Sequence, residues 1–240
     1  MKKAFLILLS ALLLFSAAAF AQEAAVTLEP VPADSAAAAR ETADRMEEKF
    51  GVAIALEGEV PEDILADLGI LEDALGKYSE QFFSVLKDRN HPEGLLITLT
   101  GADGGEAQPV ECRVGERDGR YGIFLAYGGF SGTTVHHAIW HALEKAIKAK
   151  YLYAFSDWTL LNPQSFVYPY DYSVNTEEYD ETYFARGYGT VSQEEDRATI
   201  FEATFYENFE EWVTGKTGIL YKLNYMVTFL NMLAEQPAAE

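Results

Sequence analysis

Histidine is rare in this chain, and most of it lies in one short segment. The sequence holds four histidines, and three of them, His136, His137 and His141, fall within six residues. His137 and His141 are four residues apart, so on a helix they lie one turn apart on the same face. Two imidazoles at this spacing can both reach one metal ion at about 2.0–2.1 Å. The pair therefore indicates a metal site, although such pairs also occur as surface or core residues that bind nothing.

The elements that must position this pair are a helix and the strand before it. Residues 121–127 predict a strand that ends at Gly128-Gly129, and residues 133–150 predict the helix that carries the histidines. Glu144 falls on the same face as His141, one turn later, where its carboxylate could accept the spare N–H of a ligating histidine.

The whole chain predicts an α+β fold. Residues 40–130 are expected to form an α/β lobe with a small, mainly antiparallel sheet, and residues 131–236 a helical lobe that contains the histidine helix. The predicted strands are 52–56, 95–100, 109–114 and 121–127; the predicted helices are 40–50, 61–86 (one or two helices), 133–150, 192–209 and 217–233, with a long loop over 157–180.

The first residues predict export. Lys2-Lys3 precede an apolar run over Ala4–Phe15, and Ala19-Phe20-Ala21 is a small-x-small cleavage signal. We expect a signal peptide over 1–21 that is cleaved after Ala21, and a flexible tether over 22–39. The predicted location is secreted or periplasmic, without a stable membrane anchor after cleavage.

The charge of the chain limits its partners. It has 18 Lys and Arg against 38 Asp and Glu, a formal net charge of −20 at pH 7. Binding to phosphate groups needs a cationic surface, so the composition argues against nucleic acid and anionic membranes as partners.

The histidine segment and the sequence after it resemble a known family. The run 134–144 is similar to the active-site helix of zincin metallopeptidases, H-E-x-x-H, with an acidic residue three positions after the second histidine. The downstream residues resemble a family of exported bacterial zinc-binding metallopeptidases, distantly similar to gluzincins of the anthrax lethal-factor type. The similarity covers about 122–209. The residues after the histidine segment that carry the similarity are Trp158, Leu161-Asn162-Pro163, Phe166, Tyr168, Tyr183-Phe184, Tyr188 and Glu195-Asp196-Arg197-Ala198.

This resemblance implies a zincin-like fold and a zinc ion held by His137, His141 and Glu195. Three protein ligands leave a fourth position open, as in catalytic zinc sites. Tyr188 matches a tyrosine that helps to hold the oxyanion, and a peptide substrate would lie along an edge strand at 121–127.

Two of these assignments have local alternatives. Ser192 and Glu195 also form a capping-box pattern, in which Glu195 would only bond back to the start of its helix. Tyr188 is one of 14 tyrosines, and packing is its simplest role. Asp196 is expected to pair with Arg197 near the site or on the helix surface.

The chain departs from the family pattern at Ala138, which occupies the position of the zincin glutamate that transfers protons. A positioned general acid–base contributes about 10²–10⁴ in rate. His136 lies about 100° to the other side of His137 on a helix, so it cannot occupy the same place and could act only through a bridging water or on a water approached differently. Glu194 is another candidate base, and His136 is otherwise expected beside the metal ligands.

Three hypotheses follow. The chain is a zinc metallopeptidase-like protein whose peptide-bond hydrolysis is impaired by Ala138, or a non-catalytic pseudopeptidase that binds a peptide or surface ligand. The third is a metal-free structural protein in which the histidines only pack.

Overall fold

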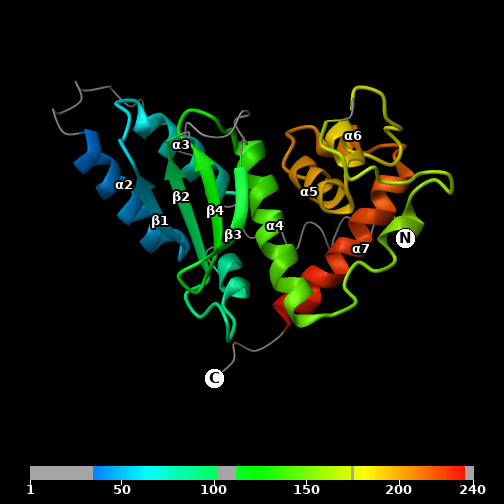
Figure 1. Cartoon of the computed structure of the whole chain (residues 1–240), viewed down its shortest axis with the longest axis horizontal. Coiled ribbons are helices and arrows are strands. Elements are labelled where there is room, and N and C mark those ends of the chain that lie inside the picture. Colours follow the sequence, from blue (N-terminus) through cyan, green and yellow to red (C-terminus); the bar gives the residue numbers. More distant parts are fainter. Residues whose placement is uncertain (1–34, 80, 102–111, 174–175, 236–240) are drawn as a thin grey trace. The chain divides into compact units, whose positions relative to one another are not determined.

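The computed structural model describes residues 35–79, 81–101, 112–173 and 176–235. The predicted signal peptide and most of the predicted tether lie outside these ranges. The chain divides into two compact units, 1–132 and 133–240, close to the predicted lobe boundary, and each unit is described by itself (Figure 1). Across the described ranges, no helix has the length and apolarity needed to cross a lipid bilayer.

The N-terminal unit contains a four-stranded sheet with the order β1-β2-β4-β3. Strand β1 pairs with β2 in parallel, β2 pairs with β4 in parallel, and only β3 and β4 are antiparallel. The strands are β1 Ala53–Glu57, β2 Leu95–Thr100, β3 Cys112–Arg117 and β4 Arg120–Ala126. The prediction of an α+β chain with a small sheet is confirmed, but the prediction of a mainly antiparallel sheet is wrong.

The connections explain the parallel pairing. A parallel pair needs a long crossover, and helix α3 (Ile64–Leu75) and the 3-10 helix η1 (Phe82–Leu86) fill the connection between β1 and β2. Only β3 and β4 are joined by a tight turn, at Asp118-Gly119, where both residues have positive φ. The apolar run of β2, which is almost entirely buried, is typical of a strand covered on both faces.

The two edges of the sheet differ. Strand β4 lies inside the sheet, so the prediction that 121–127 is an edge strand is wrong; the edge on that side is β3. At the other edge, side chains of helix α2 (Ser35–Phe50) satisfy the backbone of Ile54 in β1: Arg40 Nη1 donates to its carbonyl at 2.8 Å, and Glu47 Oε1 accepts from its N–H at 2.9 Å. The helix therefore blocks this edge against pairing with another strand.

The folded part of the chain starts earlier than predicted, with helix α2. It begins at Ser35 rather than at the predicted Arg40. Ala39, Ala43, Met46 and Phe50 are buried at helical spacing, so the end of the predicted tether already belongs to the folded unit.

The C-terminal unit is helical. Its α-helices are α4 Gly132–Lys150, α5 Gln193–Ala203, α6 Phe209–Trp212 and α7 Thr217–Ala234, and its 3-10 helices are η2 Trp158–Leu161 and η3 Gly187–Thr190. The predicted helices at 133–150 and 217–233 are confirmed, whereas α5 ends at Ala203, before the predicted Phe209.

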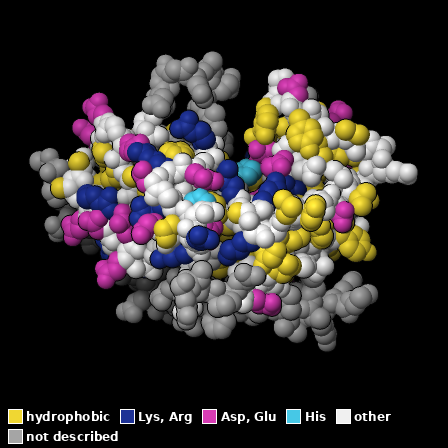
Figure 2. All heavy atoms as spheres, turned by 60° about the horizontal axis from the view of Figure 1, so that its bottom comes forward, with side chains coloured by type: hydrophobic (Ala, Val, Ile, Leu, Met, Phe, Trp, Pro, Cys, Tyr) yellow, Lys and Arg dark blue, Asp and Glu magenta, His cyan; other side chains and the backbone are white. Residues whose placement is uncertain are grey.

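Helix α5 packs against α7 and η3. The close approach of η3 to α5 requires glycine at position 189, because a Cβ on Gly189 would lie 2.6 Å from Thr199 Oγ1 of α5. Among the described residues, every large apolar side chain that is more than half exposed lies in this C-terminal unit, and hydrophobic side chains are visible among charged ones on the surface in Figure 2.

Candidate metal centre

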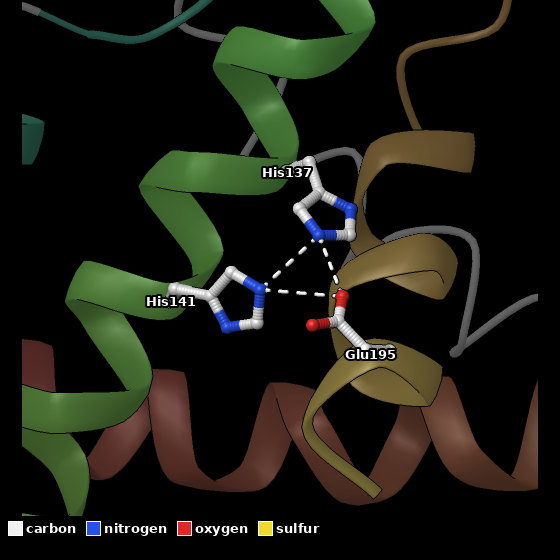
Figure 3. A group of neighbouring side chains, drawn as sticks. All are labelled: His137, His141 and Glu195. Carbon is white, nitrogen blue, oxygen red and sulfur yellow. Dashed lines mark hydrogen bonds and ion pairs between the residues drawn. The ribbon is translucent and has the colours of Figure 1, made fainter. Parts of the chain in front are cut away.

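Three side chains from two helices converge in the C-terminal unit. His137 and His141 project from α4, and Glu195 projects from the first turn of α5 (Figure 3). His137 Nε2 lies 2.9 Å from Glu195 Oε2 and 3.1 Å from His141 Nε2, and His141 Nε2 lies 3.5 Å from Glu195 Oε2. One ligand atom from each of the three residues therefore faces a common point.

The separations match those that a metal ion imposes on its ligands. Ligand atoms at about 2.0–2.1 Å from a tetrahedral ion lie roughly 3.3 Å from one another. The three distances fall on both sides of this value, so an ion slightly outside the plane of the three atoms would reach all of them. Two imidazoles and one carboxylate are donors that zinc and related ions accept. The cluster fits a metal ion in geometry and in donor chemistry.

Glu195 also takes part in the N-terminal cap of helix α5. Ser192 is the N-cap of α5, and its Oγ accepts a hydrogen bond from the Glu195 N–H at 3.2 Å. The Glu195 carboxylate is directed to the two histidines. The backbone of Glu195 thus serves the cap while its side chain remains available as a ligand.

A carboxylate that the sequence analysis missed orients His137. Glu202 Oε2 lies 2.8 Å from His137 Nδ1, and the Glu202 side chain is fully buried. With a metal ion bound, a hydrogen bond from Nδ1–H to this carboxylate would leave the Nε2 lone pair to the ion. Glu202 is held in turn by Arg186, whose Nε is 2.6 Å from Glu202 Oε1. Glu202 follows Glu195 by seven residues, two turns along the same helical face, and this spacing was the signal in the sequence.

The electrostatics of the cluster favour an ionised Glu195. Burial raises the pKa of this carboxyl, but hydrogen bonds and charge from His137 and His141 outweigh burial and lower it to about 2. Burial lowers the pKa of His137, whereas its contacts with Glu195 and Glu202 raise it more, and the net direction is upward. At neutral pH Glu195 therefore offers a charged oxygen.

Comparisons of the chain with protein-family models, with curated proteins and with solved structures found no match. The case for a metal site therefore rests on the side chains themselves.

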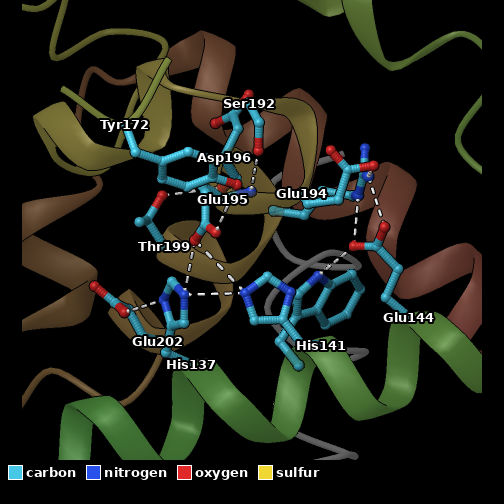
Figure 4. A network of polar contacts seen from close by, with 12 residues as sticks. His137, His141, Glu144, Tyr172, Ser192, Glu194, Glu195, Asp196, Thr199 and Glu202 are labelled. Carbon is cyan, nitrogen blue, oxygen red and sulfur yellow. Dashed lines mark hydrogen bonds and ion pairs between the residues drawn. The ribbon is translucent and has the colours of Figure 1, made fainter. Parts of the chain in front are cut away.

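Glu144 does not play the predicted part. Its carboxylate accepts hydrogen bonds from Arg197 Nη2 at 2.7 Å and Nε at 2.9 Å, and from Trp140 Nε1 at 3.0 Å (Figure 4). A buried guanidinium satisfies both carboxylate oxygens at once, which one imidazole N–H cannot do. The predicted bond from Glu144 to a ligating histidine is wrong; Glu202 makes that bond.

Asp196 does not form the predicted pair with Arg197 either. It is fully buried, and its Oδ2 lies 2.6 Å from Lys222 Nζ, 2.5 Å from the Tyr168 hydroxyl and 2.9 Å from Trp158 Nε1. Successive residues on a helix point about 100° apart, so Asp196 faces α7 and the loop before α5 while Arg197 turns to α4. Asp196 anchors the helix that carries Glu195.

His136 and Ala138 flank the first histidine. The His136 ring stacks on Phe205, with ring centroids 3.7 Å apart, and His136 is not one of the three residues of the cluster. Ala138 is fully buried and carries only a methyl group. The residue that follows His137 therefore supplies no group that can transfer a proton.

Two tyrosines lie near the cluster. The Tyr188 ring centroid is 6.1 Å from that of His137, so this residue is near the site as predicted, and Arg186 lies over its ring at 5.3 Å. Tyr172 has its hydroxyl 3.5 Å from Glu195 Oε1 and is 62% exposed. An exposed phenol beside this carboxylate can donate a hydrogen bond to a group bound next to it.

Proposed function

We propose that this chain is a zinc-binding, metallopeptidase-like protein whose peptide-bond hydrolysis is impaired. The ligands would be His137 Nε2, His141 Nε2 and Glu195 Oε2. The observation that carries the proposal is their mutual separation of 2.9, 3.1 and 3.5 Å. A set of two histidines and one glutamate leaves one of four positions open, which is typical of catalytic rather than structural zinc.

Each residue has a defined part. The two imidazoles donate lone pairs, Glu195 contributes a negative charge, and Glu202 fixes the orientation of His137. A zinc ion, when bound, supplies Lewis acidity, which polarises a carbonyl and acidifies water. The open position would take an oxygen of a peptide carbonyl or carboxylate, with Tyr172 and Tyr188 as neighbouring hydrogen-bond donors.

A second candidate function, a non-catalytic peptide-binding module, is favoured by the contacts that three potential bases near the cluster already make. Glu194 lies 3.1 Å from Lys148 Nζ, Glu144 is held by Arg197, and His136 stacks on Phe205. Without a group that accepts and returns the proton, hydrolysis would lose about 10²–10⁴ in rate.

Metal analysis of the purified chain tests the first part of the proposal. We expect about one zinc ion per chain, and its loss in His141→Ala. A natural chain that retains no metal after purification in zinc and fails to bind added zinc would refute the metal site.

The variant Ala138→Glu tests the second part. We expect chelator-sensitive cleavage of a peptide library by Ala138→Glu, and little or none by the natural chain or by Ala138→Gln, which has the same shape but cannot carry the proton. Because Ala138 is fully buried, thermal melting must first show that both variants are folded. Equal cleavage by the natural chain would contradict the impaired-enzyme proposal.

A further inference from the structure

Glu202 is a buried acid with two charged or polar partners, His137 and Arg186. His137 Nδ1 is 2.8 Å from its Oε2, and Arg186 contacts both of its oxygens, at 2.6 Å from Nε to Oε1 and 3.1 Å from Nη2 to Oε2. The side chain of Glu202 is 0% exposed, whereas that of Arg186 is 41% exposed. The three residues therefore form a polar chain from the surface to the first metal ligand.

We propose that Glu202 and Arg186 are positioning residues that control metal affinity through His137. Glu202 holds the imidazole with its proton on Nδ1 and thereby directs the Nε2 lone pair toward His141 and Glu195. Arg186 fixes the Glu202 carboxylate and balances its charge. This inference rests on the proposed zinc site, and it adds which residues outside the ligand set determine how tightly that site binds.

The energetics of burial favour a specific role for Glu202. Removing a carboxylate from water is unfavourable by several kcal/mol unless partners offset it, and an apolar residue of similar size would pack without that penalty. Glu202 lies on the buried side of α5, one turn from Ala198 and Thr199, where an apolar side chain would be ordinary. A charge retained at this position is explained by its bond to His137, because a carboxylate both selects the ring tautomer and makes the imidazole a stronger ligand.

A second buried acid in the same unit provides the matched control. Glu144 is also almost fully buried and is also paired with an arginine, Arg197. It contacts no ligand of the cluster, so its loss should affect the stability of the fold rather than the metal. Glu144→Gln and Glu202→Gln therefore make the same chemical change in similar surroundings, and only one of them touches a metal ligand.

The affinity experiment measures zinc dissociation constants by competition with a chromophoric chelator. We expect Glu202→Gln to weaken zinc binding about 10–100-fold, as is typical for partners of ligating histidines. The amide can turn its NH2 toward Nδ1 and so stabilise the wrong tautomer. Arg186→Gln should weaken binding in the same direction, and Arg186→Lys should recover part of the loss because it restores the charge without the planar fork. Glu144→Gln should stay within about twofold of the natural chain.

A second measurement reads His137 directly and needs no metal. The chain has four histidines, so the 15N signals of a histidine-labelled, metal-free sample can be assigned with His137→Gln as a reference. We expect the His137 Nδ1 signal to be that of a protonated nitrogen in the natural chain and in Glu144→Gln, and to change in Glu202→Gln. The absorption spectrum of the cobalt-substituted protein should likewise change in Glu202→Gln but not in Glu144→Gln.

The outcomes separate this inference from the proposed function. If the natural chain binds no zinc, the proposed function fails, and the metal-free 15N signals still decide whether Glu202 sets the state of His137. If the natural chain binds zinc and Glu202→Gln keeps its affinity within twofold with an unchanged His137 signal, the positioning role is wrong. Equal weakening in Glu202→Gln and Glu144→Gln would also overturn it, because the effect would then belong to the fold.

Discussion

His137 Nε2 and Glu195 Oε2, which belong to residues 58 positions apart in the chain, lie 2.9 Å from each other. Each is a potential metal ligand, and each is fixed by a second contact. Glu202 holds the far nitrogen of His137, and the Ser192 cap holds the backbone of Glu195. The pair is therefore held by the fold on both sides, as a preorganised binding site requires.

Replacing Glu195 by glutamine should abolish tight zinc binding, because the amide oxygen has no charge to offer the ion. The loss should exceed the roughly 10–100-fold effect expected for an outer partner of a ligand. The adjacent Glu194→Gln is the control, since Glu194 is 42% exposed and bonds to Lys148. Chelator competition measures both, and a Glu195→Gln protein with natural affinity would exclude Glu195 as a ligand.

Zinc should raise the thermal stability of the chain. An ion that binds only the folded state adds about 2.7 kcal/mol to the free energy of unfolding when its concentration is 100 times the dissociation constant. We expect the melting temperature to rise with added zinc and to fall again with a chelator. His141→Ala should show neither change. A natural chain that contains zinc but melts at the same temperature with and without it would contradict this coupling.

Lys222→Met should destabilise the C-terminal unit. Lys222 Nζ lies 2.6 Å from Asp196 Oδ2, and both side chains are 0% exposed. Removing one member of a buried ion pair leaves the other charge uncompensated and is unfavourable by about 3–5 kcal/mol. The exposed Lys145→Met, on α4, should change the free energy of unfolding by no more than about 0.5 kcal/mol. Urea denaturation measures both, and similar values for the two variants would refute the role of the buried pair.

Stability should also fall at acid pH because of Glu144. Burial raises the pKa of this carboxyl, but hydrogen bonds and charge from Arg197 outweigh burial and hold the pKa below the ordinary value of 4.5. The folded state therefore binds this proton less readily than the unfolded state does. The stabilisation is complete above the unfolded pKa and is lost as the pH falls through the folded pKa.

Glu144→Gln isolates this contribution, because the amide has no proton to bind. Denaturation between pH 7 and pH 3 should show a smaller loss of stability in Glu144→Gln than in the natural chain. Parallel curves for the two proteins would show that Glu144 contributes nothing to the acid sensitivity.

Several features of the chain follow from sequence alone because they depend on local spacing. His137 and His141 share a face because they are one helical turn apart, and α4 places them so that their Nε2 atoms are 3.1 Å apart. Ser192 caps α5 as its position before an acidic turn predicts. The turn at Asp118-Gly119 follows from residues that tolerate positive φ.

The tertiary structure decided the partners that come from distant segments. Glu144 has the spacing to serve a histidine, yet it bonds to Arg197 and leaves that place to Glu202, which is 65 residues from His137. The sheet is mainly parallel because the connection between β1 and β2 crosses over through a helix, which strand patterns do not reveal. The spacing of residues along one helix fixes the direction in which a side chain points. Which charged side chain it contacts depends on how whole helices pack, and this packing is set by the burial of apolar residues over the entire chain.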